Sequence, residues 1–288
     1  MMNIAVLMTC HDRREITLRC LEAFVRAIQI RAKRLGSNEK LQWEFFIVDD
    51  GSTDGTGEAL KRMFECSPFA EATEDKSNVL NGRVIKGNGN LFWAKGMALA
   101  WRTALESETN HQPPATNHKP QFSHFLWLND DTILFPNALD SLLDLSRKNK
   151  NAVIVGSLVD EMTGLKTCGV KEDGLFTGNF VFIPKFAYEK VGLICDQFHH
   201  AWADSDYAIR CRHVGVRVLE LEGVGATRAH DLRPSLRGVP LFERIRLLVD
   251  PKGWCVHDLW LYRRRNWGVS AAVLSVVHFV FHVLKGER

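Results

Sequence analysis

The sequence has little of what marks several common classes of protein. No two of its seven cysteines form a C-x-x-C pair, so it indicates neither a zinc ribbon nor a disulfide framework, and we expect reduced cysteines. The first eight residues are too short for the apolar region of a signal peptide, and no internal repeat is visible. The 37 basic and 34 acidic residues give a net charge of only +3, without the concentrated basic surface of a nucleic-acid binder. We therefore expect a cytoplasmic protein that does not bind nucleic acid.

Strand and helix patterns alternate through the first half of the chain. The predicted strands cover residues 3–9, 43–48, 82–85, 125–128 and 152–158, and the predicted helices cover residues 16–34, 57–65, 97–105 and 136–148. Such alternation indicates a parallel, doubly wound sheet. At 288 residues, 45% of them hydrophobic, the chain can bury a sizeable core.

The alternation stops after residue 158. The pattern then predicts a hairpin at 164–169, strands at 178–184, 216–221 and 225–230, and a short helix that ends at 191. Asp204 or Ser205 is suited to cap a further helix that runs to about His213.

Two adjacent carboxylates follow the most apolar of these strands. Residues 125–128 (FLWL) lead directly into Asn129, Asp130, Asp131 and Thr132. Ligands of an open α/β sheet bind just beyond the carboxyl ends of its strands. Neighbouring carboxylates repel each other, and a divalent cation held by oxygen ligands commonly relieves the repulsion. The alternative is an Asx turn after a strand, where Asn and Asp are simply good turn residues.

Other predicted strands also end in small or polar residues. The segment 49–56 (DDGSTDGT) follows the second strand, and the glycine-rich segment 86–96 follows the third. Glycines permit tight turns and close approach of the backbone to a ligand. Neither the Walker pattern nor G-x-G-x-x-G is present. A nucleotidyltransferase would need a glycine-rich basic loop after the first strand, where residues 10–13 (CHDR) stand instead.

From Leu241 onward the chain is basic and helical in pattern. Its last apolar stretch, residues 268–284, has seventeen residues, fewer than the roughly 20 that span a bilayer. A basic segment that leads into an apolar helix fits an interfacial helix on an anionic membrane surface. The alternative is a helix packed on the domain or in a dimer. We predict two parts, residues 1–235 and a C-terminal helical extension, residues 236–288.

Four segments stand in an order that resembles a known family. They are residues 48–54 (VDDGSTD), 89–93 (GNLFW), 128–132 (LNDDT) and 204–206 (DSD) with Arg210. Together they resemble the inverting, GT-A-fold glycosyltransferases of family 2, most nearly the bacterial rhamnosyltransferase-like group that builds O-antigen and related polysaccharides. The resemblance covers about residues 3–230. It implies a Rossmann-like GT-A fold with a mainly parallel central sheet and flanking helices.

The resemblance also implies roles in binding a nucleotide-diphosphate sugar. Thr9 and Asp50 match the contacts to the nucleotide base and its surroundings, and Asn90 matches a wall of the donor pocket. Asp130 matches a residue near the ribose or the sugar. Asp131 matches the ligand of a divalent metal, Mg²⁺ or Mn²⁺, that bridges the donor diphosphate.

The resemblance assigns two further roles later in the chain. In several family members a histidine at the position of His230 completes the metal site, and the alternative is an ordinary surface or capped histidine. Asp204 matches the catalytic base. The sequence departs from the family at Ala203, where glutamate is usual, which leaves the base between Asp204 and Asp206. The spacing to Arg210 favours Asp204, and the alternative is that both aspartates merely favour a helix N-terminus.

These roles predict an inverting, metal-dependent sugar transfer. We expect dTDP-rhamnose first and UDP-sugars next as donor, and a saccharide or lipid-linked saccharide as acceptor, at the inner face of the membrane. Trp202, which precedes the base, could stack on a sugar or lie in the core. The alternative function, supported by Ala203, is a non-catalytic nucleotide-sugar-binding or scaffold protein with the same fold.

Overall fold

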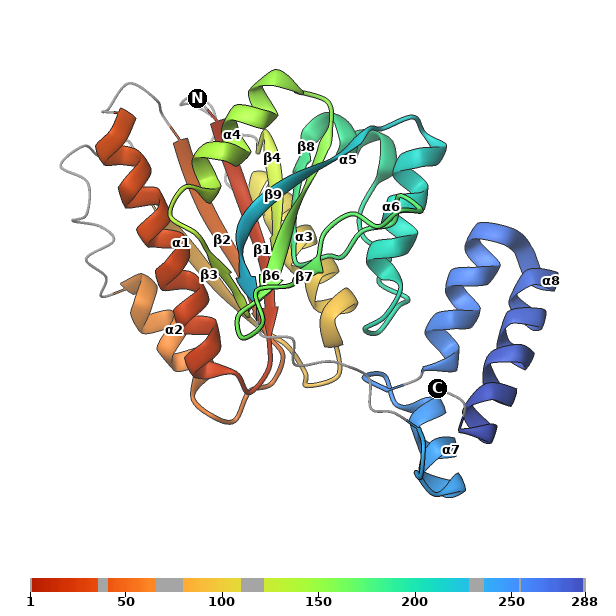
Figure 1. Cartoon of the computed structure of the whole chain (residues 1–288). Helices are drawn as coiled ribbons and strands as arrows, with labels where there is room; N and C mark the ends of the chain where they lie inside the picture. The colour runs from red at the N-terminus through yellow and green to blue at the C-terminus, as the bar shows by residue number, and fades with distance from the viewer. Residues whose placement is uncertain are drawn as a thin grey trace.

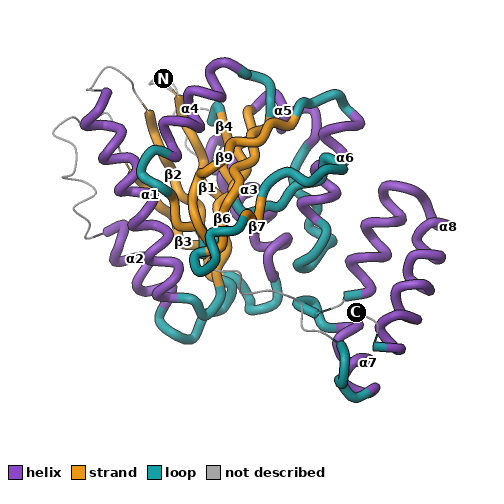
Figure 2. Tube along the Cα trace, viewed as in Figure 1, coloured by secondary structure: helices purple, strands orange, loops and turns teal. Residues whose placement is uncertain are grey.

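The computed structural model describes residues 2–35, 41–65, 80–109, 122–227, 236–253 and 255–286. Its described strands form a single nine-stranded sheet with helices on both faces (Figure 1). Eight strands follow the order β3-β2-β1-β4-β8-β6-β9-β5, and β7 pairs with β6 at the side. Two further helices, α7 and α8, stand beside the sheet domain at the C-terminal end (Figure 2).

The first half of the chain builds a parallel half-sheet. Its strands are β1 (Met2–Cys10), β2 (Leu41–Asp49), β3 (Leu80–Lys86) and β4 (His124–Leu128), and all three pairings among them are parallel. The crossovers contain α1 (Arg14–Leu35), α2 (Thr56–Glu65) and α3 (Phe92–Thr109). The predicted parallel, doubly wound arrangement is therefore confirmed for this half.

The central strands β1 and β4 are buried on both faces, as their apolar runs predicted. Val6 and Met8 face a core shared with α1 and α4 (Ala138–Lys148), whereas Ala5 and Leu7 face a core shared with α3. Side chains alternate across a strand, so a strand packed on both faces is apolar throughout.

The second half of the chain is mixed in direction. It adds β5 (Thr132–Leu134), β6 (Val153–Asp160), β7 (Lys166–Cys168), β8 (Phe180–Pro184) and β9 (Val218–Thr227), with the helices α5 (Lys185–Val191) and α6 (Ala203–His213). Strand β8 runs antiparallel between β4 and β6, and β6 and β9 are parallel. The predicted hairpin is present as β6 and β7.

Two boundaries differ from the prediction. The expected strands at 216–221 and 225–230 form one strand, β9. The pairing of β9 with β6 shifts register between Gly156 and Leu158, so the strand continues through the glycine between the two predicted segments. Residues 228–230 lie outside the described part. Helix α3 begins at Phe92, five residues earlier than residue 97, because the carboxylate of Asp50, which follows β2, accepts the first backbone N–H of the helix.

The C-terminal helices form a small cluster of their own. Helix α8 (Val256–Lys285) bends at Gly268, whose φ of 86° is non-helical, and its two arms lie side by side (Figure 1). Leu259 of the first arm and Phe279 of the second share one apolar cluster with Leu248 of α7 (Leu241–Val249). By length and composition alone, α8 is apolar enough to cross a membrane, and only 17% of its most apolar window is buried. The division at residue 235 stays a prediction.

Candidate functional site

The parallel strands bring their carboxyl ends to one edge of the sheet. Cys10 of β1 is in register with Asp49 of β2, and Asp49 is in register with Lys86 of β3. Strand β4 lies on the other side of β1, in parallel register. The polar segments that follow these four strands therefore meet, as their positions in the sequence predicted.

Asp50 organises the glycine-rich segment at this edge. Its buried carboxylate accepts hydrogen bonds from the backbone N–H groups of Gly89 (2.8 Å), Leu91 (2.9 Å) and Phe92 (3.0 Å). The next residue, Gly51, has a φ of +75°, and a Cβ there would lie 2.9 Å from the backbone of Gly89. Asp50 thus holds the loop that begins α3. Its predicted contact to the nucleotide base stays a prediction, since the backbone occupies both oxygens.

Asp130 and Asp131 share one cationic neighbour. Nη1 of Arg13, just before α1, lies 3.2 Å from Oδ1 of Asp130 and 3.4 Å from Oδ2 of Asp131. Burial, opposed by the charge of Arg13 and assisted by that of Asp131, raises the pKa of Asp130 to about 7. The backbone also turns here, with the amide of Thr132 bonded to the carbonyl of Asn129. The corner is therefore a turn and a charged site at once.

The carboxylate corner fits a divalent cation. Both side chains offer hard oxygen donors, which Mg²⁺ and Mn²⁺ prefer. Burial is the main cause of the raised pKa of Asp130, and a bound cation would relieve the additional repulsion from Asp131. Sequence reasoning missed Arg13, although a basic residue in the turn after the first strand was the available signal.

A chain of contacts links this corner to Asp204. The pairing of β4 with β8 continues past Leu128, because the N–H of Asn129 donates to the carbonyl of Asn179 (2.9 Å). Nε1 of Trp93 donates to Oδ1 of Asn129 (2.7 Å), and a Cβ on Gly178 would lie 2.5 Å from the Trp93 ring. The N–H of Gly178 donates to Oδ2 of Asp204 (3.0 Å). Asn129 and Asp204, far apart in the sequence, are therefore linked through two intervening residues.

Asp204 and Asp206 occupy different surroundings. Oδ1 of Asp204 accepts the N–H of Ser205 (2.7 Å), and no basic side chain of the described residues forms an ion pair with it. Burial is the largest influence on Asp204 and raises the pKa of its carboxyl. Asp206 is 1% exposed and pairs with Nε of Arg210 and Nε of Arg265, each at 3.0 Å. The structure gives Asp206 a structural role, and the assignment of the base to Asp204 stays a prediction.

The predicted helix cap is wrong. Helix α6 begins at Ala203, and its N-cap is Trp202, with a φ of 70° and no side-chain cap hydrogen bond. Asp204 and Ser205 therefore lie within the first turn. The Trp202 ring stacks on Tyr262 of α8, with centroids 4.8 Å apart, which places it in the packing between the two helices.

The remaining predicted site residues differ in their exposure. Thr9 is half-buried, and a Cβ on Gly96 of α3 would lie 2.4 Å from its Oγ1. Asn90 is exposed, and its N–H donates to the side chain of Asn88. His230 lies outside the described residues, so its proposed role as a metal ligand stays a prediction.

Comparisons with known proteins agree with this geometry. The chain resembles the mannosyltransferase PcManGT from Pyrobaculum calidifontis, solved in complex with GDP-Man and Mn²⁺, at a TM-score of 0.55 and 15% identity over 98% of this chain and 72% of that one. It also resembles S. aureus TarS residues 1–349 in complex with UDP-GlcNAc, at a TM-score of 0.54 and 10% identity over 99% of this chain and 82% of that one. At such identities the likeness shows the fold alone. No curated protein sequence matches the chain significantly.

The sequence itself carries the family assignment. The family model described as Glycosyl transferase family 2 matches residues 5–203, which is more than half of the chain. The GT-A fold predicted from the four motifs is therefore confirmed, and so is an enzyme that uses a nucleotide sugar. The chain belongs to glycosyl transferase family 2, whose members are inverting glycosyltransferases.

Proposed function

We propose that this enzyme transfers a sugar to a saccharide or lipid-linked saccharide in the synthesis of a cell-surface polysaccharide, with Asp204 as the catalytic base. The observation that carries the proposal is the position of the Asp204 carboxylate. It is connected through Gly178 and Trp93 to the Asn129–Asp131 corner, and it forms no ion pair with the described basic side chains.

The surroundings of Asp204 suit proton removal. A sugar hydroxyl is a poor nucleophile, and a positioned carboxylate can take its proton as the bond to the anomeric carbon forms. Burial raises the pKa of Asp204, which strengthens its carboxylate as a base. The N–H groups of Gly178 and Ser205 hold the carboxylate in place. Attack from the side opposite the leaving group inverts the anomeric configuration.

Asp131, with His230 as the predicted second ligand, would hold the divalent metal. When bound, such a metal stabilises the negative charge that develops on the departing nucleoside diphosphate. Asp130 would then face the ribose or sugar of the donor. Imidazole is a more natural ligand for Mn²⁺ than for Mg²⁺, and the Mn²⁺ of the mannosyltransferase supports this choice by likeness. For the donor we keep dTDP-rhamnose first and UDP-sugars next.

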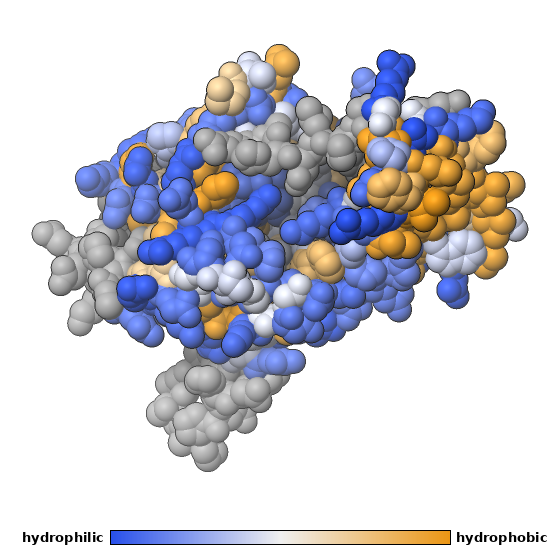
Figure 3. Space-filling model, turned by 90° about the horizontal axis from the view of Figure 1, so that it is seen from below, coloured by the Kyte–Doolittle hydropathy of each residue, from blue (hydrophilic) through white to orange (hydrophobic). Residues whose placement is uncertain are grey.

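We further propose that α7 and α8 rest on an anionic membrane surface. Exposed apolar side chains gather on these helices, and Figure 3 shows an apolar region at that end of the molecule. They are Leu241, Phe242, Ile245, Val249, Trp267, Val269, Val273, Leu274, Val277, Phe281 and Leu284. Residues 236–288 carry nine Lys or Arg against four Asp or Glu, and this charge complements anionic lipids.

The bend in α8 favours a surface position over a span. Each arm between Val256, Gly268 and Lys285 has at most seventeen residues. At about 1.5 Å per residue, neither arm crosses a hydrocarbon core of about 30 Å. An amphipathic pair of arms can instead bury one apolar face at the interface.

Thermal stabilisation by nucleotides tests the donor site. Nucleoside diphosphates and nucleotide sugars are added to the whole chain with and without Mn²⁺ or Mg²⁺. A ligand that binds the folded state raises the melting temperature by mass action. We expect a metal-dependent shift that Asp131→Ala abolishes and the exposed-surface control Asp144→Asn retains. The absence of any shift would overturn the donor site.

Turnover of Asp204→Asn tests the base. This variant should retain the nucleotide shift and lose transfer by at least about a hundredfold. Wild-type turnover in Asp204→Asn would contradict the assignment.

Sedimentation with vesicles tests the membrane surface. Vesicles that contain phosphatidylglycerol should carry the protein down more than vesicles of phosphatidylcholine alone. Leu274→Glu should reduce this binding, whereas Leu165→Glu, at a similarly exposed leucine of the sheet domain, should not. Equal loss in both variants would contradict a specific surface.

A further inference from the structure

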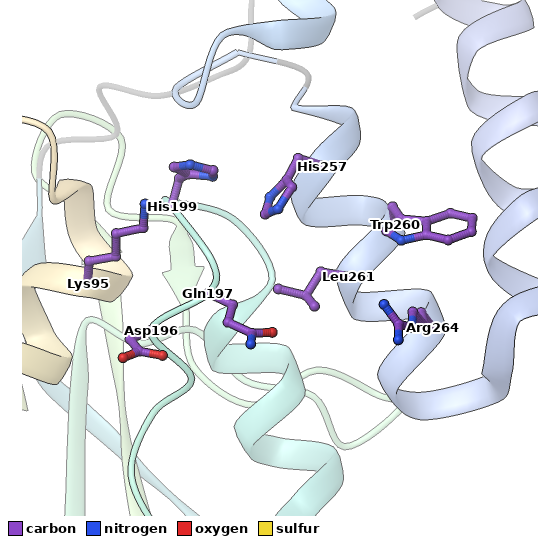
Figure 4. A pocket seen from close by; sticks show the side chains of 8 residues that line it. All are labelled: Lys95, Asp196, Gln197, His199, His257, Trp260, Leu261 and Arg264. Carbon is purple, nitrogen blue, oxygen red and sulfur yellow. The ribbon is translucent and has the colours of Figure 1, made fainter.

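A cavity of about 490 Å³ lies between the sheet domain and α8. Its walls come from the start of α3, the segment 196–199 and the first arm of α8 (Figure 4). Lys95 and His199 lie on the side of the sheet domain, and His257, Leu261 and Arg264 lie along the first arm of α8 (Figure 4). The cavity therefore lies between the two predicted parts of the chain, residues 1–235 and residues 236–288.

The cavity holds positive charge without a carboxylate partner. No carboxylate of the described residues lies within ion-pair distance of Lys95 or Arg264. The acidic residue in the wall, Asp196, pairs with Arg102 at 2.8 Å. Unpaired cations in a cavity are suited to an anionic ligand.

A buried carboxylate orients the two histidines. Oδ1 of Asp258, which is 0% exposed, lies 2.9 Å from Nδ1 of His199 and 3.1 Å from Nδ1 of His257. When both Nδ1 atoms donate to this carboxylate, each Nε2 is left to contact a ligand. The thiol of Cys255 lies in the same group, within 4.8 Å. Asp258 also accepts backbone N–H groups of residues 199–201, so we assign the group to positioning and not to metal binding.

The cavity adjoins the donor site on one side. The carbonyl of His199 accepts the N–H of Ala94 (2.9 Å), and the His199 ring meets the edge of Phe92 with centroids 6.0 Å apart. Phe92 is one of the residues whose backbone Asp50 holds. A ligand in the cavity is therefore next to the loop that forms the donor-pocket wall.

On its other side the cavity adjoins the exposed apolar helices. Leu261 is part of the cavity wall, and Trp260 in the same wall points toward the second arm of α8 (Figure 4). That arm carries the exposed apolar side chains of the proposed membrane surface. Cations next to the donor loop, followed by apolar surface, match a ligand with an anionic head and an apolar tail.

We propose that this cavity binds the phosphate or diphosphate group of a lipid-linked acceptor. The inference rests on the proposed function, because it names the chemical class of the acceptor. Lys95 and Arg264 neutralise the phosphate oxygens, and His199 and His257, in their protonated form, donate to these oxygens through Nε2. The lipid chain leaves along the apolar face of α8. The acceptor is thereby presented beside the donor loop.

Binding of farnesyl diphosphate to the full chain tests the proposal. The titration is done in EDTA, and is repeated with Asp131→Ala so that binding at the metal-dependent donor site is excluded. We expect saturable binding of farnesyl diphosphate, weaker binding of inorganic pyrophosphate, and none of farnesol. The proposal would be overturned if farnesol bound as tightly as farnesyl diphosphate, or if farnesyl diphosphate did not bind. Pyrophosphate binding as tight as that of farnesyl diphosphate would overturn the lipid part.

Variants locate the binding. Lys95→Gln and Arg264→Gln should each weaken farnesyl diphosphate binding about tenfold, which is the effect of one charge-assisted contact. Arg264→Lys should retain most of the affinity, and Lys148→Gln, on the exposed surface of α4, should retain all of it. Wild-type affinity in Lys95→Gln and Arg264→Gln would overturn the assignment. The nucleotide shift of the same preparations reports the donor site independently, so failure of one site is distinguishable from failure of the other.

Discussion

Replacement of Asp50 should damage the fold and the donor site together. Its carboxylate is 4% exposed and accepts three backbone N–H groups, from Gly89, Leu91 and Phe92. In Asp50→Ala these donors lose their partner, and the N-terminus of α3 loses a favourable negative charge. The resemblance alone assigns Asp50 a contact to the base, which predicts lost donor affinity without lost stability.

The contacts set the expected magnitude. A hydrogen bond to a charged group contributes about 1.5–3 kcal/mol, and such bonds within one group are not additive. Since water can reach the half-buried loop, we expect Asp50→Ala to lower the free energy of unfolding by about 3–5 kcal/mol. Asp50→Asn keeps one acceptor oxygen but turns an amide N–H₂ toward the backbone donors, so its expected cost is about 2 kcal/mol.

Urea denaturation of the wild type and both variants measures these differences. In thermal denaturation, at about 2 °C per kcal/mol for a chain of this size, the melting temperature of Asp50→Ala should fall by about 6–10 °C. Asp144→Asn, at a carboxylate that is 62% exposed and pairs with Arg147 on the surface, should change stability by less than about 0.5 kcal/mol. Wild-type stability in Asp50→Ala, with donor affinity lost, would refute the structural role.

Three other changes test further contacts. Arg265→Ala removes one of the cations on buried Asp206 and should cost about 1–3 kcal/mol in urea denaturation; an unchanged midpoint would contradict the ion pair that joins α6 to α8. Gly178→Ala places a Cβ 2.5 Å from the Trp93 ring and should lower kcat at least about tenfold, because the ring must move; wild-type kcat would show that the ring position is unimportant. Burial lowers the pKa of His124 from 6.5 to about 4, so the unfolded chain takes up a proton that the folded chain refuses as pH falls through this window. As pH falls from 6.5 to 4.5, the free energy of unfolding should therefore fall by about 1–2 kcal/mol less in His124→Phe than in the wild type. Identical pH profiles of the two proteins would contradict this reasoning.

The sequence predicted the parallel half of the sheet because its signals are local. Most strands there are apolar runs, and the helices repeat apolar residues at helical spacing, so both patterns can be read without knowledge of distant contacts. The same reasoning failed at α3. Its first turn depends on Asp50, which lies about forty residues earlier and caps it through space. The sequence pattern also predicted two strands in place of β9, since the register shift against β6 depends on the partner strand.

The residues of the candidate site also divide into those that the sequence predicted and those that it did not. The residues at strand ends, Asp50, Asp130 and Asp131, were found because parallel strands place their carboxyl ends at one edge. Arg13 was missed, because its position in the turn after the first strand does not by itself indicate which carboxylates it contacts. The catalytic role of Asp204 was assigned only through resemblance.

The sequence alone determines which residues place carboxylates at the ends of buried strands. It also determines the spacing of apolar residues that makes those segments strands. The different surroundings of Asp204 and Asp206 depend on the tertiary structure, because two carboxylates two residues apart look alike until their neighbours are known. Arg265, from the far end of the chain, neutralises Asp206, and the amide of Gly178 holds Asp204 beside the site. Ionic and hydrogen-bonding partners are set by proximity in space, and only the folded chain brings residues so distant in sequence within 3 Å.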